Sequence, residues 1–254
     1  MNNLVETIRD SVKVYGKPCV NISGGLDSTI ILHHLIEKCK EPIYTYTAGF
    51  TKEETEFEHA EKVADHYGTR HTNVTIENLM REFPEILKHF KRPRFNLWPY
   101  WLARQAKADD RESCYIGEGG DEHFGGYWYK PRRTYVENWT SFFIYVYPTY
   151  RTIYKDILNI RLVVPLHPDN LDWHKTLPFY DAEQNKKFLR EAYRGILPDF
   201  VVDRKKKNGR RDYWQMWNQE LKNRFFNVTP KSEAEIKDLW NMRATQIWLD
   251  NKTV

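Results

Sequence analysis

Hydrophobic and polar residues follow two different periods along the first half of the chain. Helices are predicted where apolar residues recur every three or four positions, over residues 4–14, 29–36, 53–67, 78–90 and 98–109. Strands are predicted where β-branched and aromatic residues form short runs, over residues 19–22, 43–50, 71–76 and 113–117. Strands that alternate with helices indicate an α/β fold with a doubly wound parallel sheet.

The pattern changes near residue 128, where aromatic and irregular sequence gives way to mostly helical sequence. We therefore divide the chain into residues 1–127 and a mostly helical lobe, residues 128–254. One continuous domain is the alternative. A chain of 254 residues can bury a full core in either arrangement.

Composition excludes several classes of protein. No stretch approaches the roughly 20 consecutive apolar residues of a membrane helix, and Glu6 and Asp10 interrupt the start of the chain, unlike a signal peptide. We therefore expect a cytoplasmic protein that does not bind membranes. Cys19, Cys39 and Cys114 form no CxxC pair, and their odd number favours reduced thiols over a disulfide framework or a zinc site.

A glycine-rich turn, SGGLDS at residues 23–28, joins the first predicted strand to the next helix. Backbone N–H groups and the helix dipole converge there, which favours binding of a diphosphate. Gly24 and Gly25 let phosphate oxygens approach the backbone, and Ser23 and Ser28 add hydroxyl donors. Asp27 supplies a hard oxygen ligand for the Mg²⁺ that accompanies a triphosphate.

This turn differs from the common nucleotide-binding motifs, since the sequence contains neither GxxxxGK(S/T) nor GxGxxG. SGGLDS resembles the PP-loop of the N-type ATP pyrophosphatases. These enzymes cleave ATP between the α and β phosphates and pass AMP to a substrate. The resemblance implies ATP and Mg²⁺ as cofactors.

A second motif, GEGGDEHFGGY at residues 117–127, follows the predicted strand 113–117. It resembles the GEGxDExFGGY element of asparagine synthetases and β-lactam synthetases. At a strand end, Asp121 can reach the same Mg²⁺ as Asp27. The resemblance makes Glu118 the catalytic glutamate, which takes a proton from the attacking amine.

The same resemblance assigns adenine binding to backbone groups around Ile22, Ala48 and Gly117. In the second half, the sequence is similar to the family's LRxA, LP and RxK elements at residues 189–192, 197–198 and 204–206. That similarity makes Lys206 the catalytic cation, a role that suits the compact charge of a lysine. Lys205 or Lys207 could fill the role instead.

Two departures from the family concern the substrates. In residues 159–168 the glutamate and the aspartate of the family's ExRxPFLD element are missing or displaced, which makes aspartate a doubtful acyl substrate. Asn2 stands where glutamine-using asparagine synthetases carry a cysteine nucleophile. We expect the nitrogen donor to be free ammonia, an amine, or ammonia from a separate glutaminase.

Four histidines, His33, His34, His59 and His66, lie on predicted helices without HExxH or another metal-ligand spacing. We interpret them as ordinary polar or partly buried residues.

The sequence thus predicts an ATP-dependent carbon–nitrogen ligase that resembles asparagine synthetase. It adenylates a small carboxylate with release of pyrophosphate, and ammonia or an amine then displaces AMP. Residues 1–127 would bind the nucleotide, and residues 128–254 would complete the substrate site. The alternatives are a PP-loop enzyme that adenylates a nucleobase or tRNA, and a nucleic-acid-binding or partner-binding protein. The net charge of +4 is small for a nucleic-acid-binding protein.

Overall fold

The computed structural model describes residues 2–50, 55–77, 79–127, 134–181, 183–204 and 230–252. Five parallel strands form one sheet in the order β3-β2-β1-β4-β5. Their bounds are β1 (Pro18–Asn21), β2 (Tyr44–Gly49), β3 (Arg70–Thr75), β4 (Ser113–Tyr115) and β5 (Arg161–Val163). The chain runs outward from β1 to β3 and then returns to the other side of β1. The strand order therefore reverses between β1 and β4, where open α/β sheets bind their ligands.

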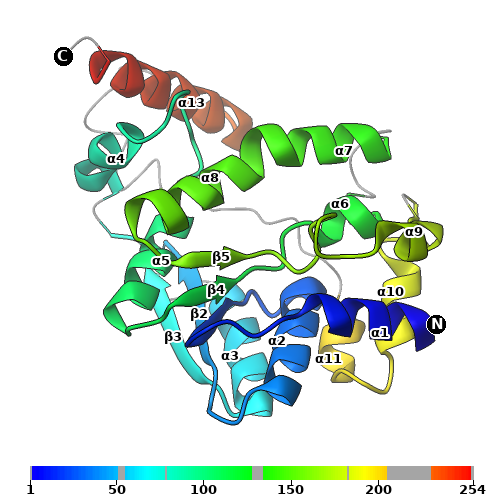
Figure 1. Cartoon of the computed structure of the whole chain (residues 1–254). Coiled ribbons are helices and arrows are strands. Elements are labelled where there is room, and N and C mark those ends of the chain that lie inside the picture. Colours follow the sequence, from blue (N-terminus) through cyan, green and yellow to red (C-terminus); the bar gives the residue numbers. More distant parts are fainter. Residues whose placement is uncertain are drawn as a thin grey trace.

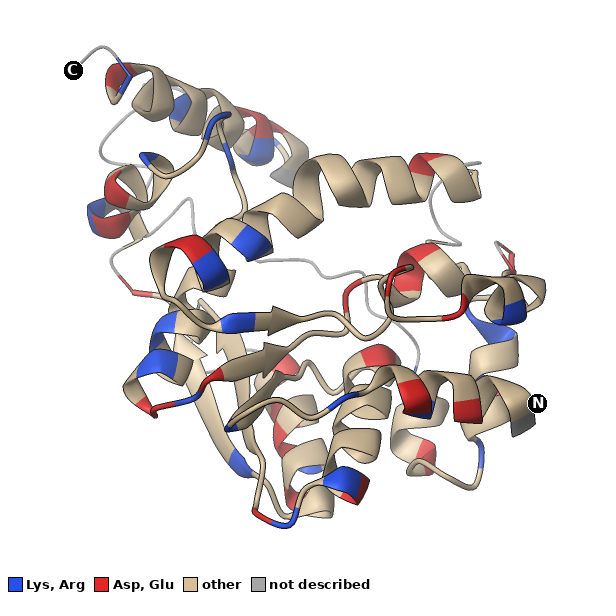
Figure 2. Cartoon of the chain, viewed as in Figure 1, with Lys and Arg blue, Asp and Glu red and all other residues tan. Residues whose placement is uncertain are grey.

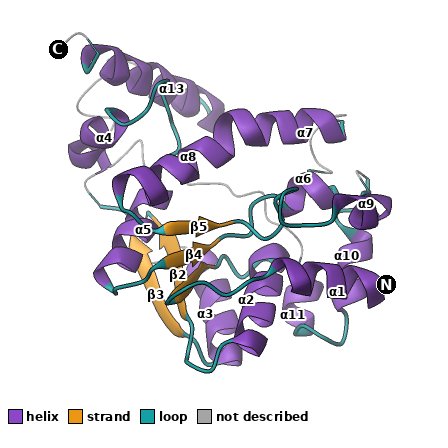
Figure 3. Cartoon of the chain, in the orientation of Figure 1, coloured by secondary structure: helices purple, strands orange, loops and turns teal. Residues whose placement is uncertain are grey.

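Helices cover both faces of this sheet (Figures 1 and 3). In the first half they are α1 (Asn2–Ser11), α2 (Leu26–Lys38), α3 (Thr55–Tyr67), α4 (Leu79–Leu87), α5 (Pro99–Ala108) and α6 (Gly120–Phe124). A helical rod follows, made of α7 (Tyr135–Ser141), η1 (Phe142–Val146), α8 (Tyr147–Arg151) and η2 (Thr152–Ile157). The later elements are α9 (Trp173–Thr176), η3 (Leu177–Phe179), α10 (Lys187–Tyr193), α11 (Asp199–Val202) and α13 (Glu233–Asp250). No helix in the described ranges has both the length and the apolar character that a membrane crossing requires.

The core has two halves, one on each face of the sheet. Successive strand residues point to opposite faces, so Cys19 and Cys114 pack into one half while Val20 and Tyr115 pack into the other. The half of the core that contains Cys19 and Cys114 is covered by large side chains from α4, α5, η2 and α13, namely Phe83, Trp101, Tyr154 and Trp240. The half of the core that contains Val20 and Tyr115 is covered by side chains from α1, α2, α3 and α10, namely Ile8, Ile31, Val63 and Tyr193. This is the doubly wound arrangement that the periodicity predicts.

Charged residues are rare in the sheet. Among the described strands only Arg70 and Arg161 are charged. Figure 2 shows Lys and Arg interspersed with Asp and Glu over the helices and loops of the chain. All three cysteines have free thiols, with Cys19 and Cys114 buried.

The predicted strands agree with the observed ones to within two residues, and the α/β fold is confirmed. The fifth strand, β5, was not predicted. It pairs with β4 in the register Ser113↔Arg161, Cys114↔Leu162 and Tyr115↔Val163. The sheet therefore includes residues from beyond position 127, as the alternative of one continuous domain requires. The division at residue 128 stays a prediction.

Candidate active site

The loops that follow β1 and β4 border one cavity at the carboxyl ends of the strands. Its volume is about 480 Å³, within the range of small-molecule sites. The predicted site residues that line it are Ile22, Ser23, Gly25, Asp27, Ser28, Ala48, Gly117, Glu118 and Asp121. Gly24 lies in the same loop but is not among the described residues that line the cavity. The structure thus brings together two segments that are about 90 residues apart.

The loop after β1 is held to the neighbouring strand by hydrogen bonds. The Ile22 N–H donates to the carbonyl oxygen of Tyr46 at 2.9 Å, and the Thr47 hydroxyl donates to the Ile22 carbonyl oxygen at 2.6 Å. Gly25 is the N-cap of α2, and no side chain of the described residues caps this helix end. The N–H groups of the first turn therefore remain available to an anion.

Asp27 and Asp121 meet at one point, although each begins a different helix. The Lys186 ammonium group donates to Oδ2 of Asp27 and lies 2.5 Å from Oδ1 of Asp121. Lys186 is only 3% exposed. Burial alone would lower the pKa of its ammonium group, but the Asp121 and Asp27 carboxylates outweigh that effect and raise the pKa above its ordinary value. Lys186 is therefore a buried cation that holds two carboxylates together.

The backbone that carries Lys186 is strained. Asn185 and Lys186 have φ values of 49° and 62°, in the left-handed region that residues other than glycine seldom adopt. Such conformations cost on the order of 1–2 kcal/mol each and persist where the surroundings enforce them. The two ion pairs of Lys186 supply such a constraint. The strain is thus tied to the position of this cation in the cavity.

The two aspartates fit a Mg²⁺ ion. Carboxylate oxygens are the hard ligands that Mg²⁺ prefers, and the group of two carboxylates and one ammonium keeps a net charge of −1. The close approach depends on Gly120, where a Cβ would lie 2.5 Å from Cγ of Asp27. Asp27 and Asp121 would therefore hold the ion between the two loops.

Glu118 also faces the cavity, and a tyrosine of the helical rod orients it. The buried Tyr150 donates its hydroxyl proton to Oε1 of Glu118 at 2.9 Å. The Tyr150 ring in turn meets the Trp98 ring edge-to-face, with centroids 6.0 Å apart. This carboxylate is accordingly held at a defined position beside an aromatic wall.

The next acidic residue of the motif, Glu122, has a different environment. It is buried, and it accepts hydrogen bonds from the Gly119 N–H at 3.2 Å and from the Tyr127 hydroxyl at 2.6 Å. Burial, with added repulsion from Asp121 and Glu118, raises the pKa of its carboxyl group to about 7. Glu122 therefore stabilises the loop through these hydrogen bonds and is not among the described residues that line the cavity.

Two arginines from the C-terminal part of the chain also line the cavity. Arg204 donates to the Ser23 carbonyl oxygen at 2.7 Å and to Glu56 at 3.2 Å. Arg190 donates to the Asn185 carbonyl oxygen at 3.1 Å. The LRxA and RxK elements therefore border the cavity, and Arg204 of the RxK element contacts the loop that follows β1.

Comparison with known proteins agrees with this geometry. A family model described as asparagine synthase matches residues 3–175. The chain belongs to the asparagine synthase family. It is 31% identical over 132 residues to the glutamine-hydrolyzing asparagine synthetase 1 of Bacillus subtilis, a match that covers 48% of this chain and 21% of that relative. It is 29% identical over 126 residues to the glutamine-hydrolyzing asparagine synthetase 3 of Arabidopsis thaliana, covering 43% of this chain and 22% of that relative. The chain thus spans about a fifth of the length of these relatives.

Within this asparagine synthase fold, three sequence assignments need comment. Lys206 lies outside the described residues, as do Lys205 and Lys207, so the role of Lys206 stays a prediction. Residues 159–168, which depart from the family element, form β5 and the turn after it, and none of them lines the cavity. Lys186 was not predicted at all. The signal that could have found it is its place three residues before the LRxA element.

Proposed function

We propose that this chain catalyses ATP-dependent amide formation. A carboxylate substrate attacks the α-phosphorus of ATP and releases pyrophosphate, and ammonia or an amine then displaces AMP from the acyl adenylate. The observation that best supports this is the meeting of residues 22–28 and 117–121 in one cavity, where Asp27 and Asp121 converge. Membership of the asparagine synthase family supports the same reaction class.

In this proposal, different residues of the chain bind the metal ion, the phosphates and the adenine. Asp27 and Asp121 hold Mg²⁺, which when bound neutralises charge on the phosphates. The first turn of α2, with Ser23 and Ser28, binds the pyrophosphate portion. The backbone around Ile22, Ala48 and Gly117 contacts the adenine. All the residues named here line the cavity.

The second half-reaction is assigned to Glu118. A carboxylate within hydrogen-bond reach of an incoming ammonium or amine can take its proton, and Tyr150 keeps Glu118 oriented for this. Lys206 remains our assigned catalytic cation from the family resemblance. The contact of Arg204 with Ser23 supports a phosphate role for this segment.

The lining beside Glu118 favours an acid with an apolar portion. Trp98 and Tyr150 form an aromatic wall there, and Leu102 and Ile116 also line the cavity. Aspartate, with a second carboxylate, gains little from such surfaces because burying an unpaired charge is costly. We therefore propose an acyl substrate less polar than aspartate.

A pyrophosphate-release screen over candidate acids, with and without ammonia, tests the proposal. We expect one or more acids to give AMP and pyrophosphate in equal amounts, only when Mg²⁺ is present. Formation of ADP and phosphate would remove the chain from this class. Pyrophosphate release that requires a nucleobase or tRNA would favour the alternative acceptor. Strong, salt-dependent RNA binding without turnover would favour a binding protein.

The nitrogen source is tested in the same assay. We propose free ammonia, an amine, or ammonia from a separate glutaminase, and we expect the reaction to take place in the cytoplasm. Release of glutamate from glutamine by this chain alone, in step with AMP formation, would contradict the proposed nitrogen source.

A further inference from the structure

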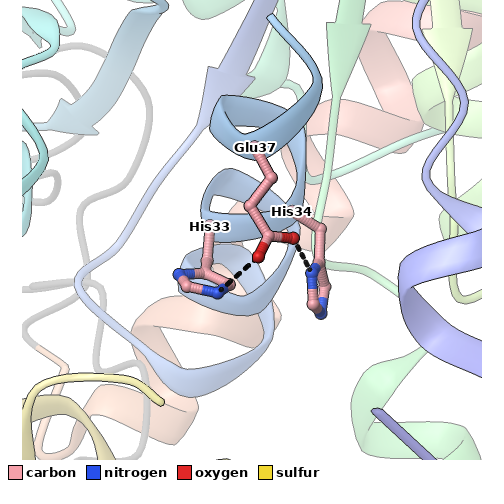
Figure 4. Close-up of side chains that lie close together, drawn as sticks. All are labelled: His33, His34 and Glu37. Atoms are coloured by element: carbon pink, nitrogen blue, oxygen red, sulfur yellow. Dashed lines mark hydrogen bonds and ion pairs between the residues drawn. The ribbon is translucent and has the colours of Figure 1, made fainter. Parts of the chain in front are cut away.

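A second cluster of ionisable side chains lies on α2, toward the end opposite the active-site loop. His33, His34 and Glu37 each offer one ligand atom, and these atoms all lie within 4.8 Å of one another. Figure 4 shows the Glu37 carboxylate between the two imidazole rings. The spacing of one and then three residues brings all three side chains to one side of the helix.

The distances are close to those of a metal centre. His34 Nδ1 lies 2.8 Å from Glu37 Oε2, and His33 Nε2 lies 3.5 Å from Glu37 Oε1. Around a tetrahedral Zn²⁺ with bonds of about 2.0–2.1 Å, neighbouring ligand atoms are about 3.3 Å apart. The two imidazoles contact different oxygens of Glu37, so side-chain movements are needed to bring all three ligand atoms onto one ion.

Each imidazole has a tyrosine hydroxyl on its other nitrogen. His34 Nε2 lies 2.8 Å from the Tyr193 hydroxyl of α10, and His33 Nδ1 lies 3.3 Å from the Tyr67 hydroxyl of α3. Histidines that bind a metal nearly always donate their second ring N–H to a carboxylate, a backbone carbonyl or water, which orients the ring. Here the two tyrosine hydroxyls take that position. With an ion on Nδ1, the His34 proton would sit on Nε2 and be donated to Tyr193. The supporting contacts are thus already in place.

Burial and charge also suit a cation. His34 is 1% exposed, while the Glu37 side chain is 46% exposed, so an ion and a water molecule can enter from the solvent side. The Glu37 carboxylate supplies a negative charge beside the two imidazole nitrogens.

We propose that His33 Nε2, His34 Nδ1 and a Glu37 carboxylate oxygen bind one Zn²⁺ ion, with water completing the coordination. Two imidazoles and one carboxylate are a donor set that zinc accepts. The ion joins α2 to α3 and α10 through Tyr67 and Tyr193. This site is separate from the Asp27–Asp121 site, so its existence does not depend on the proposed function.

Isothermal titration of the metal-free full chain with ZnCl₂, in the presence of excess Mg²⁺, tests the proposal. We expect one saturable Zn²⁺ site per chain. His33→Ala and Glu37→Gln should each weaken Zn²⁺ binding about tenfold or more, since loss of even a supporting residue typically has that effect. Glu37 is exposed and His33 is partly exposed, so these variants should fold, whereas a change at the buried His34 could unfold the chain.

Matched controls are available on exposed residues. His89→Ala and Glu41→Gln should leave the Zn²⁺ affinity unchanged, because both side chains are exposed and outside the cluster. Substitution of Co²⁺ should produce absorption bands of a four-coordinate site in the wild type and not in Glu37→Gln. The proposal is overturned if no one-to-one complex forms, if both cluster variants bind as tightly as the wild type, or if Cys39→Ser abolishes binding instead.

Discussion

Replacing Lys186 by methionine should destabilise the metal-free protein strongly and raise its affinity for Mg²⁺. The ammonium group is buried between the Asp27 and Asp121 carboxylates, and methionine keeps much of the side-chain volume without the charge. The two carboxylates would then face each other across the cavity with no cation between them. A divalent ion would gain both as ligands without displacing a competitor.

The magnitude follows from the geometry. Because both oxygens contact one nitrogen, they lie about 5 Å apart or less, and two unit charges at that separation repel by about 3 kcal/mol at an effective dielectric constant of 20. Removal of one partner of a buried ion pair typically costs about 3–5 kcal/mol. We therefore expect Lys186→Met to lower the free energy of unfolding by about 3–5 kcal/mol in the absence of metal.

Urea unfolding at mildly alkaline pH, with EDTA or with excess Mg²⁺, measures both effects. The stability lost in EDTA should be recovered in part by Mg²⁺. Lys187→Met is the matched control, since Lys187 is the exposed neighbour and should change stability by less than about 0.5 kcal/mol. If both variants lost the same small amount, or if Mg²⁺ did not stabilise Lys186→Met more than the wild type, the reasoning would be refuted.

Three further predictions concern the cavity and the core. Asp121→Asn should abolish pyrophosphate release while the chain stays folded, and substantial turnover in a Mg²⁺-dependent assay would argue against the assigned ligand. Tyr150→Phe removes the hydrogen bond to Glu118 and should lower kcat about 10-fold or more, because a net hydrogen bond to a charged group contributes about 1.5–3 kcal/mol and each change of about 1.4 kcal/mol in the barrier is tenfold in rate. An unaltered kcat would mean that this orientation is not needed. Trp101→Ala empties a site that is 1% exposed and should reduce the unfolding free energy by about 3–5 kcal/mol in urea, whereas a loss under 1 kcal/mol would mean that the core collapses around it.

The fold could be predicted from local patterns because each of the first four strands lies in a short run rich in apolar, β-branched or aromatic residues beside a periodic helix. The fifth strand, Arg161–Val163, is as short as β4 but is not followed by a glycine motif such as the one at residues 117–127. Three residues establish no period, and their strand conformation depends on pairing with β4 from about 50 positions away.

The site was predictable to the extent that its residues lie in strand-end motifs. Asp27 and Asp121 belong to such motifs, and parallel strands bring their carboxyl ends to one edge. Lys186 follows no such rule, since it reaches Asp27 across 159 residues from a left-handed backbone position. The sequence could not single out His33 and His34 as metal ligands. That proposal depends on their contacts with Glu37 of the same helix and with two tyrosines of other helices.

The central claim, adenylation of a carboxylate, is tested most directly by isotope transfer. The chain is incubated with ATP, Mg²⁺, ammonia and an active acid whose carboxylate carries ¹⁸O, and the AMP is analysed by mass spectrometry. Our account predicts one ¹⁸O atom in the phosphate of each AMP formed, because the carboxylate oxygen that attacks the α-phosphorus stays with AMP when the amide forms. AMP without ¹⁸O, or ¹⁸O found only in inorganic phosphate, would contradict it.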